Sequence, residues 1–161
     1  MHDIDNQSLS PKSDVVLYQP AIAQNMGNII RTCSVTGVNL SYVPPTGFSL
    51  QSKDFKRSGM DYHDDISLSC ITYWEQWLDE NQHRVFFFSS HATTSFFDVD
   101  LTGAALVFGS ETSGLPNVIH NKYKNRFVTI PMRPDKRCLN LSNSVAIAIY
   151  ESIRQTRCKV I

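Results

Sequence analysis

The stretch IPMRPDKRCLNLSNSVAIAIYESIR, from Ile130 to Arg154, joins the end of an apolar run, a basic polar loop and an apolar helix. The Asn and Ser side chains around Ser142 can cap free backbone N–H groups and can also bind a polar ligand. One face of the expected helix is apolar at helical spacing, and Ile147 and Tyr150 fall on the opposite face. A helix that is apolar on two sides is either sandwiched within one chain or shared with a second chain.

Upstream of this stretch, apolar runs alternate with helical patterns. Strands are predicted over residues 15–18, 38–43, 66–71, 84–89, 104–108 and 127–130. Helices are predicted from an Asn25 N-cap to Gly37, after a Ser52 cap, from a capping box at 72–75 to about Asn81, and from Pro116 to about Tyr123. The alternation predicts an α/β domain with a largely parallel sheet.

The size and charge of the chain favour one domain. With 161 residues, of which 42% are hydrophobic, the chain can form one well-buried core. We expect a single domain over residues 15–161, after a polar and loosely ordered extension from Met1 to Asp14 that lacks the apolar core of a signal peptide. Lys+Arg and Asp+Glu are both 15, so a nucleic acid must be bound by a local basic patch.

The four cysteines, Cys33, Cys70, Cys138 and Cys158, are widely spaced and form no CxxC pair. This pattern is typical of reduced cytosolic thiols and not of disulfides or zinc ligands, so we expect a cytoplasmic protein without a metal. No apolar run approaches the roughly 20 residues that a membrane span needs.

A first candidate binding motif is NMGNIIR, residues 25–31, at the start of a predicted helix. Gly27 would let a ligand come close to the backbone, the helix N-terminus offers N–H groups to a phosphate, and Arg31 carries a planar set of donors. A capped surface helix with one exposed arginine explains the same residues equally well.

A second candidate motif is FGSETSGLP, residues 108–116, between a predicted strand and a predicted helix. Two glycines around a polar turn favour a loop whose backbone wraps a ligand, although an ordinary connection with a solvated Glu111 is the alternative. The motif lacks the GK[ST] ending of a P-loop and the GxGxxG pattern of dinucleotide sites.

Together, these motifs and the opening stretch resemble the SPOUT superfamily of S-adenosylmethionine-dependent RNA methyltransferases. The resemblance rests on NxGNIxR, FGxExxGLP, and IPM followed by RxLNLSN. The Leu17-Tyr18-x-Pro20 opening and the run RSGMDYH at 57–63 are similar to the single-domain TrmL type, which 2′-O-methylates the wobble nucleotide, position 34, of tRNA. The likeness covers Val15 to Arg157.

The resemblance implies a parallel sheet with helices on both faces and a C-terminal deep trefoil knot. It also implies S-adenosylmethionine as methyl donor, tRNA as substrate, no metal, and a homodimer, which agrees with the second apolar face at Ile147 and Tyr150. By position, the resemblance implies that the donor lies among Phe88, Ser89, Gly109, Glu111, Ile130, Met132, Cys138, Leu139 and Ser142.

Arg31 matches the motif-one arginine proposed to act on the ribose 2′-hydroxyl, and Asn28, Asn140 and Ser142 match polar positions near the reacting centre. An arginine is not a neutral base at pH 7, so Arg31 is expected to orient the hydroxyl and stabilise developing negative charge. The proton acceptor stays open between a phosphate of the RNA and a water.

Two basic clusters are candidates for RNA phosphate contacts, with solvated surface charge as the alternative for each residue. They comprise Lys53, Lys56 and Arg57, and Arg133, Lys136 and Arg137. The chain departs from the family pattern at Ser110, Ser113 and Cys138. Rival hypotheses are 2′-O-methylation of another tRNA or rRNA position, a non-catalytic RNA- or donor-binding relative and, least favoured, a dehydrogenase or nucleotidase.

Overall fold

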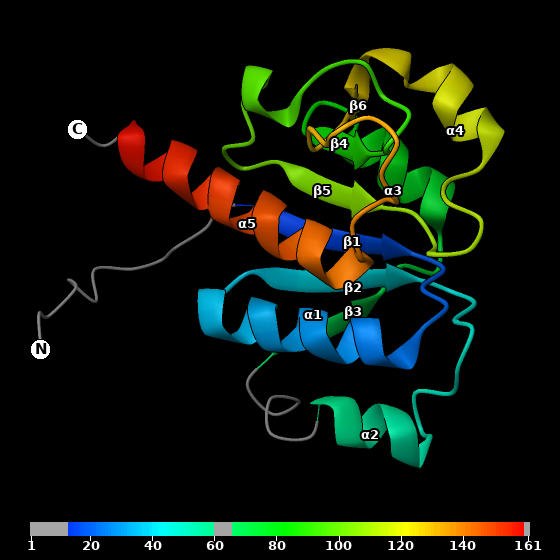
Figure 1. Ribbon diagram of the computed structural model, residues 1–161. Helices are drawn as coiled ribbons and strands as arrows, with labels where there is room; N and C mark the ends of the chain where they lie inside the picture. Colours follow the sequence, from blue (N-terminus) through cyan, green and yellow to red (C-terminus); the bar gives the residue numbers. More distant parts are fainter. Residues whose placement is uncertain (1–12, 60–65, 160–161) are drawn as a thin grey trace, which may run out of the picture.

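A computed structural model describes residues 13–59 and 66–159 of the chain as a six-stranded sheet with helices on both faces (Figure 1). All strand pairings are parallel, in the order β3-β2-β1-β5-β4-β6. The strands are β1 Asp14–Tyr18, β2 Asn39–Val43, β3 Leu68–Cys70, β4 Val85–Phe88, β5 Ala105–Phe108 and β6 Phe127–Val128. The predicted α/β class with a parallel sheet is confirmed.

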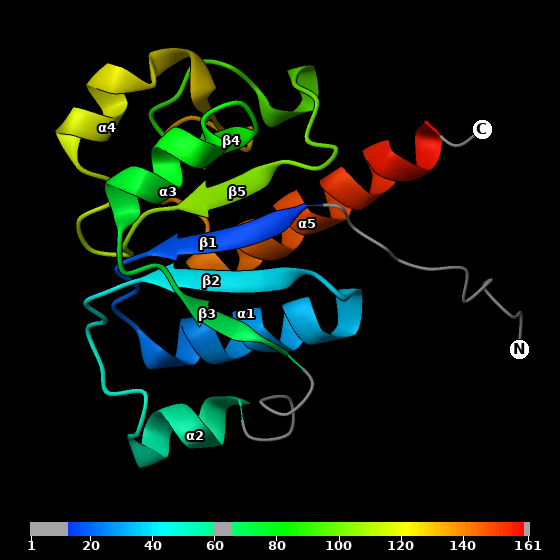
Figure 2. The ribbon, with the colours of Figure 1, turned by 180° about the vertical axis from the view of Figure 1, so that it is seen from behind.

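Five α-helices and two short 3₁₀ helices are described. They are α1 Ala23–Thr36, α2 Lys53–Gly59, α3 Trp74–Asn81, α4 Asn117–Lys122, α5 Leu141–Cys158, η1 Phe96–Asp98 and η2 Lys124–Arg126. Side chains of β1 alternate between the two faces of the sheet, as a strand requires. Val15 and Leu17 pack in the core with α1, α2 and α5, whereas Val16 packs in the core with α3 and α4. Figure 2 shows α3 on the face opposite to α1.

Helix α5 lies beside α1 over the middle of the sheet (Figure 1). Val145 and Ile149 on its inner face are fully buried, whereas Ile147 and Tyr150 are 39% and 53% exposed. The predicted division of this helix into two apolar faces is therefore confirmed, and only one of the faces is covered within the chain.

Local caps agree only in part with the predictions. Gly37 ends α1 with a φ of 72°, and Ser52 accepts a hydrogen bond from the backbone N–H of Phe55, both as predicted. Asn25 is not an N-cap, because α1 begins at Ala23 and Asn25 lies inside its first turn. The predicted capping box is also wrong, since α3 follows Tyr73 without a side-chain cap.

The ordered fold begins earlier than expected. Ser13 is buried and its hydroxyl donates to the carbonyl of Leu101, and Asp14 belongs to β1, where it pairs with Arg84. The predicted loosely ordered extension is therefore wrong at Ser13 and Asp14, while its residues 1–12 lie outside the described residues. Residues 60–63 of the RSGMDYH motif also lie outside them.

Candidate active site

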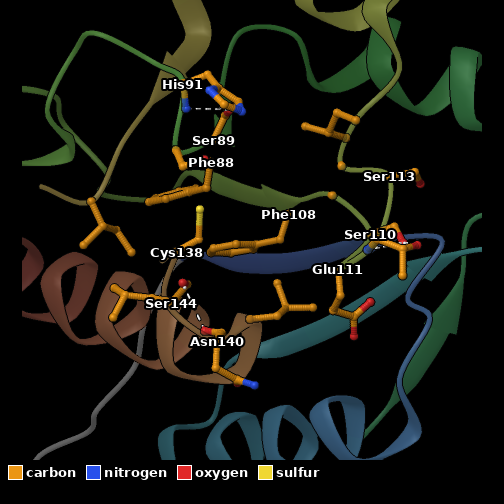
Figure 3. A pocket seen from close by; sticks show the side chains of 18 of the residues that line it. Phe88, Ser89, His91, Phe108, Ser110, Glu111, Ser113, Cys138, Asn140 and Ser144 are labelled. Carbon is orange, nitrogen blue, oxygen red and sulfur yellow. Dashed lines mark hydrogen bonds between the residues drawn. The ribbon is translucent and has the colours of Figure 1, made fainter. Parts of the chain in front are cut away.

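A pocket of about 700 Å³ lies where the carboxyl ends of β4, β5 and β6 meet the loop after β1 (Figure 3). In open parallel sheets, ligands bind at this edge. Of the nine residues predicted to lie around the methyl donor, all except Ser142 line the pocket: Phe88, Ser89, Gly109, Glu111, Ile130, Met132, Cys138 and Leu139. The fold thus brings together residues from three separate parts of the sequence.

The loop after β5 folds back on itself. The backbone N–H of Ser110 donates to the carbonyl of Gly114 at 3.2 Å, and the N–H of Gly114 donates back at 2.9 Å. A Cβ atom at Gly109 would lie 2.5 Å from the carbonyl carbon of Gly114, so only glycine fits there without a shift. This closed loop holds the side chain of Glu111 toward α1.

The amino end of α1 is capped by the side chain of Glu111, from another part of the chain. Ile22 precedes the helix and has no capping side-chain hydrogen bond. Instead, the Glu111 carboxylate accepts from the backbone N–H of Ala21 at 2.7 Å, from that of Ile22 at 3.3 Å and from Asn25 Nδ2 at 3.1 Å. A negative charge at this helix end is favourable. The helix N-terminus that was expected to receive a phosphate is therefore occupied by a carboxylate of the chain, and the alternative of a solvated Glu111 is wrong.

A chain of hydrogen bonds continues from Glu111 into α5. Asn140 Nδ2 donates to Asn25 Oδ1 at 2.9 Å, and Asn140 Oδ1 accepts from the backbone N–H and the hydroxyl of Ser142 at 2.8 and 2.6 Å. Because a carboxylate only accepts, the amide nitrogen of Asn25 must face Glu111, and this fixes the orientation of Asn140 in turn. Asn25 is 5% exposed, and its side chain links all three motifs.

Only one of the four predicted catalytic residues lines the pocket. Asn140 lines the pocket, but Arg31, Asn28 and Ser142 are not among its lining residues. Arg31 and Asn28 lie exposed on α1, and Ser142 is buried with its hydroxyl donated to Asn140. In this structure Ser142 therefore positions Asn140, and the catalytic roles of Arg31 and Asn28 remain predictions.

Gly27 serves a different purpose from the one expected. A Cβ atom built on it would lie 2.4 Å from the hydroxyl oxygen of Ser58, so this glycine lets α2 pack closely against α1. The prediction that Gly27 admits a ligand is wrong.

The residues predicted to contact RNA lie on the surface in two separate places. Lys53, Lys56 and Arg57 are exposed on α2, and Arg133, Lys136 and Arg137 are exposed in the segment between β6 and α5. Helix α2 packs against α1, away from β6 (Figure 1). Their contact with RNA stays a prediction.

Several pocket residues were not anticipated from the sequence. Asn25 stood inside the quoted NxGNIxR motif but was interpreted as a cap. His91, Asn117 and His120 also line the pocket, and the ring of His120 stacks on Phe127 with centroids 4.2 Å apart. The only sequence signal for His91 is its position shortly after a predicted strand, whereas Asn117 and His120 lie inside the helix predicted after Pro116.

The lining suits a molecule that is partly aromatic and partly polar. The rings of Phe88 and Phe108 stack with centroids 4.6 Å apart, and the polar side chains of Glu111 and Asn140 line the same pocket (Figure 3). The volume is typical of pockets for small organic ligands. Among residues 13–59 and 66–159 there is no group of three or more His, Cys, Asp or Glu that could hold a metal. Nor does that part of the chain contain a helix long and apolar enough to cross a membrane.

Comparison with known proteins places the chain in a family. The chain is 42% identical over 149 residues to the tRNA (cytidine(34)-2′-O)-methyltransferase of Methylovorus glucosotrophus (strain SIP3-4), covering 88% of this chain and 94% of the relative. It is 38% identical to the enzyme of the same name from Escherichia coli (strain K12), covering 88% and 92%.

Solved structures agree with the sequence comparisons. One described as "Structural insights into the 2-OH methylation of C/U34 on tRNA" superposes with a TM-score of 0.83 at 36% identity, covering 90% of this chain and 96% of the other. The SpoU methyltransferase AviRb from Streptomyces viridochromogenes, solved with AdoMet, shares the fold with a TM-score of 0.77 at 23% identity, covering 90% of this chain and 60% of the other. Residues 12–150 match the SpoU rRNA Methylase family, and the chain belongs to this family.

Proposed function

We propose that this protein transfers a methyl group from S-adenosylmethionine to the ribose 2′-hydroxyl of the wobble nucleotide of tRNA, a cytidine or modified uridine at position 34. The observation that carries the proposal is the 42% identity, over 88% of the chain, to a relative named for this reaction. The pocket supports it, because eight of the nine residues that the resemblance places around the donor, all except Ser142, line one cavity of suitable size.

The residues present fit the methyl donor. Phe88, Ile130 and Leu139 offer apolar surface to its adenosyl group, and the polar backbone beside Gly109 offers hydrogen bonds. When bound, S-adenosylmethionine supplies a methyl group on a sulfonium, which is already a good leaving group. The chain then has mainly to align the ribose oxygen and to exclude water.

The polar network gives individual residues their proposed tasks. Glu111, Asn25 and Ser142 hold the Asn140 side chain in one orientation at the pocket wall, so that it is pre-organised for the substrate. We assign Arg31 to orienting the ribose hydroxyl and stabilising the negative charge that develops on its oxygen. The proton passes to an acceptor outside this set, either an RNA phosphate or a water.

The proposal includes a threaded fold and a dimer. The segment between β6 and α5 would form the knotted wall of the pocket, and α5 would pair with a second copy through Ile147 and Tyr150, whose side chains are 39% and 53% exposed. The basic residues on α2 and between Arg133 and Arg137 would contact RNA phosphates. We place the reaction in the cytoplasm, where the four unpaired cysteines would stay reduced.

Methyl transfer to bulk tRNA tests the proposal directly. The protein is incubated with labelled S-adenosylmethionine and unmodified tRNA, and 2′-O-methyl groups are mapped by mass spectrometry. We expect label at position 34, and Arg31→Ala is expected to lower turnover at least tenfold while leaving donor binding intact. Donor binding with no methyl group in any anticodon loop, or methylation of rRNA instead, would contradict the proposed substrate.

A further inference from the structure

A second, smaller cavity lies outside the site described above. It has a volume of about 350 Å³ and is lined by Gln82 and His83 together with residues 121–126, and we call it the basic groove. Four of its eight lining residues, His83, Lys122, Lys124 and Arg126, can carry positive charge, and none is a carboxylate. The remaining lining residues are Gln82, Asn121, Tyr123 and Asn125.

The charge in this region is concentrated although the chain as a whole is neutral. Three of the 15 Lys and Arg residues fall at alternate positions between Lys122 and Arg126. No Asp or Glu occurs between Glu111 and Asp135, so the segment itself supplies no counter-charge. The carboxylate in contact is Asp79 of α3, whose Oδ1 lies 3.5 Å from Lys122 Nζ, and both of these side chains are more than half exposed. A solvated pair of this kind neutralises little of the local field.

Aromatic rings and a carbonyl hold two of these cations in place. The Arg126 guanidinium lies 5.4 Å from the centroid of the Phe86 ring, and its Nη2 donates to the His83 carbonyl at 3.3 Å. Lys122 Nζ lies 5.2 Å from the centroid of the Tyr123 ring. Both contacts leave N–H donors that can face solvent. Lys124 is exposed between them.

The basic groove lies at the amino ends of β4 and β6, whereas the donor pocket lies at their carboxyl ends. Its residues precede β4 and β6, whereas the pocket residues Ser89 and Thr129 follow these strands. The four residues of β4 therefore separate the two sites by about 13 Å along the strand. A nucleic-acid duplex carries about eight phosphate charges over this length, so an RNA whose reacting nucleotide lies at the pocket also has phosphates at the distance of the groove.

We propose that the basic groove binds the phosphate backbone of the RNA substrate, as a contact separate from the donor pocket and from the two basic clusters already named. This inference rests on the proposed function, since it takes the substrate to be RNA. Phosphate oxygens accept hydrogen bonds, and the groove offers donors from Lys, Arg, His and Asn side chains. None of its lining residues is a carboxylate that would compete for these donors. Such contacts fix how the RNA is placed and do not read its sequence.

A purely structural role predicts something different. Cations near the carboxyl ends of α4 and η2 are also favourable for the helices themselves. If that were their whole role, removing them would lower stability and leave RNA binding unchanged.

The test compares Lys122→Gln/Lys124→Gln with the control Arg157→Gln/Lys159→Gln. The control removes two exposed cations at the end of α5, and its Lys159 pairs with the exposed Asp100 as Lys122 pairs with Asp79. For the groove variant we expect KM for tRNA to rise about tenfold, and the slope of log K against log salt to decrease by about 1.4 to 1.8, while kcat and donor affinity stay unchanged. The control is expected to behave like the wild type.

Binding of an anticodon stem-loop RNA, measured without methyl donor, separates this inference from the proposed function. If the wild type transfers no methyl group but binds the RNA more tightly than the groove variant, the proposed function is wrong and the inference that the groove binds RNA holds. Equal RNA affinity and equal salt slope in the groove variant and the wild type would overturn the inference that the groove binds RNA, whether the melting temperature of the variant is the same or lower.

Discussion

The two ends of α1 are built in different ways. At its carboxyl end, the N–H of Gly37 donates to the carbonyls of Cys33 and Ser34, four and three residues away, with Gly37 in the left-handed conformation. At its amino end, the capping carboxylate comes from Glu111, and it reaches Ala21 across 90 residues of sequence. The first end depends on local backbone preference, whereas the second exists only once the loop after β5 has closed. Damage to the first should therefore affect stability alone, and damage to the second should affect stability and the pocket together.

The largest effect is expected for Glu111→Ala. The change leaves the N–H groups of Ala21 and Ile22 and the amide of Asn25 without their acceptor, which costs about 2 kcal/mol where water replaces it only in part. We expect the melting temperature to fall by about 4–8 °C and donor affinity to fall at least tenfold. Calorimetric melting measures the first quantity, and titration with S-adenosylmethionine or with its product, S-adenosylhomocysteine, measures the second.

Two controls sharpen the result for Glu111. Asn25→Ala removes only one of the three donors to the carboxylate, so it should lower stability less but still loosen Asn140. Glu75→Gln removes an exposed carboxylate in the first turn of α3 and should leave donor affinity unchanged. If Glu111→Ala bound donor as tightly as Glu75→Gln, the pocket would not depend on the distant cap.

An intermediate effect is expected for Gly37→Ala at the other end of α1. A side chain at a φ of 72° costs about 1 kcal/mol, which corresponds to a fall of about 2–4 °C in melting temperature. Donor affinity and turnover should equal those of the wild type, because Gly37 and its two hydrogen-bond partners, Cys33 and Ser34, are not among the residues that line the pocket. Gly37→Asn should lose less stability, since asparagine tolerates the left-handed region. A loss of donor affinity in either variant would show that the two ends of α1 are coupled.

The smallest effect is expected for Glu151→Gln, which removes a pair formed within α5. The hydrogen bond from Arg154 lowers the pKa of Glu151, with a further contribution from Gln155. A carboxyl with a lowered pKa stabilises the fold above its unfolded pKa of about 4.3, and this contribution is lost as pH falls through the folded pKa. The difference in melting temperature between wild type and variant should be about 1–2 °C at pH 7 and should shrink toward pH 3. A constant difference across this range would contradict the assignment.

Much of the fold could be predicted from local chemistry. Continuous apolar runs gave β4 and β5, helical spacing gave the buried and exposed faces of α5, and Gly37 and Ser52 acted as predicted. The boundaries of short strands were less predictable, since β3 comprises only Leu68–Cys70 of the run 66–71 and β6 only Phe127–Val128 of the run 127–130. Strand β6 ends at Val128 because its partner in β4, Phe88, is the last residue of that strand, and no local preference encodes such a limit.

The pocket could not be predicted by physical reasoning from the sequence alone. Its residues came from resemblance to a family, because positions such as Phe88 and Cys138 carry no local sign of a shared cavity. Asn25 was misassigned because an asparagine before a helical pattern resembles a cap, and only the folded chain brings Glu111 to it from 86 residues away. Long-range pairs of polar side chains have no periodicity from which they could be inferred.

The Glu111 cap also links ligand binding in the pocket to hydrogen exchange at the start of α1. The amides of Ala21 and Ile22 donate to Glu111, and the Glu111 loop also forms one wall of the pocket. We therefore expect these amides to exchange with solvent hydrogen when the Glu111 loop opens. A ligand that needs the loop closed must therefore slow the exchange of these two amides by the same free energy with which closure favours the ligand. The exchange rates of these two backbone amides therefore report on ligand binding in the pocket.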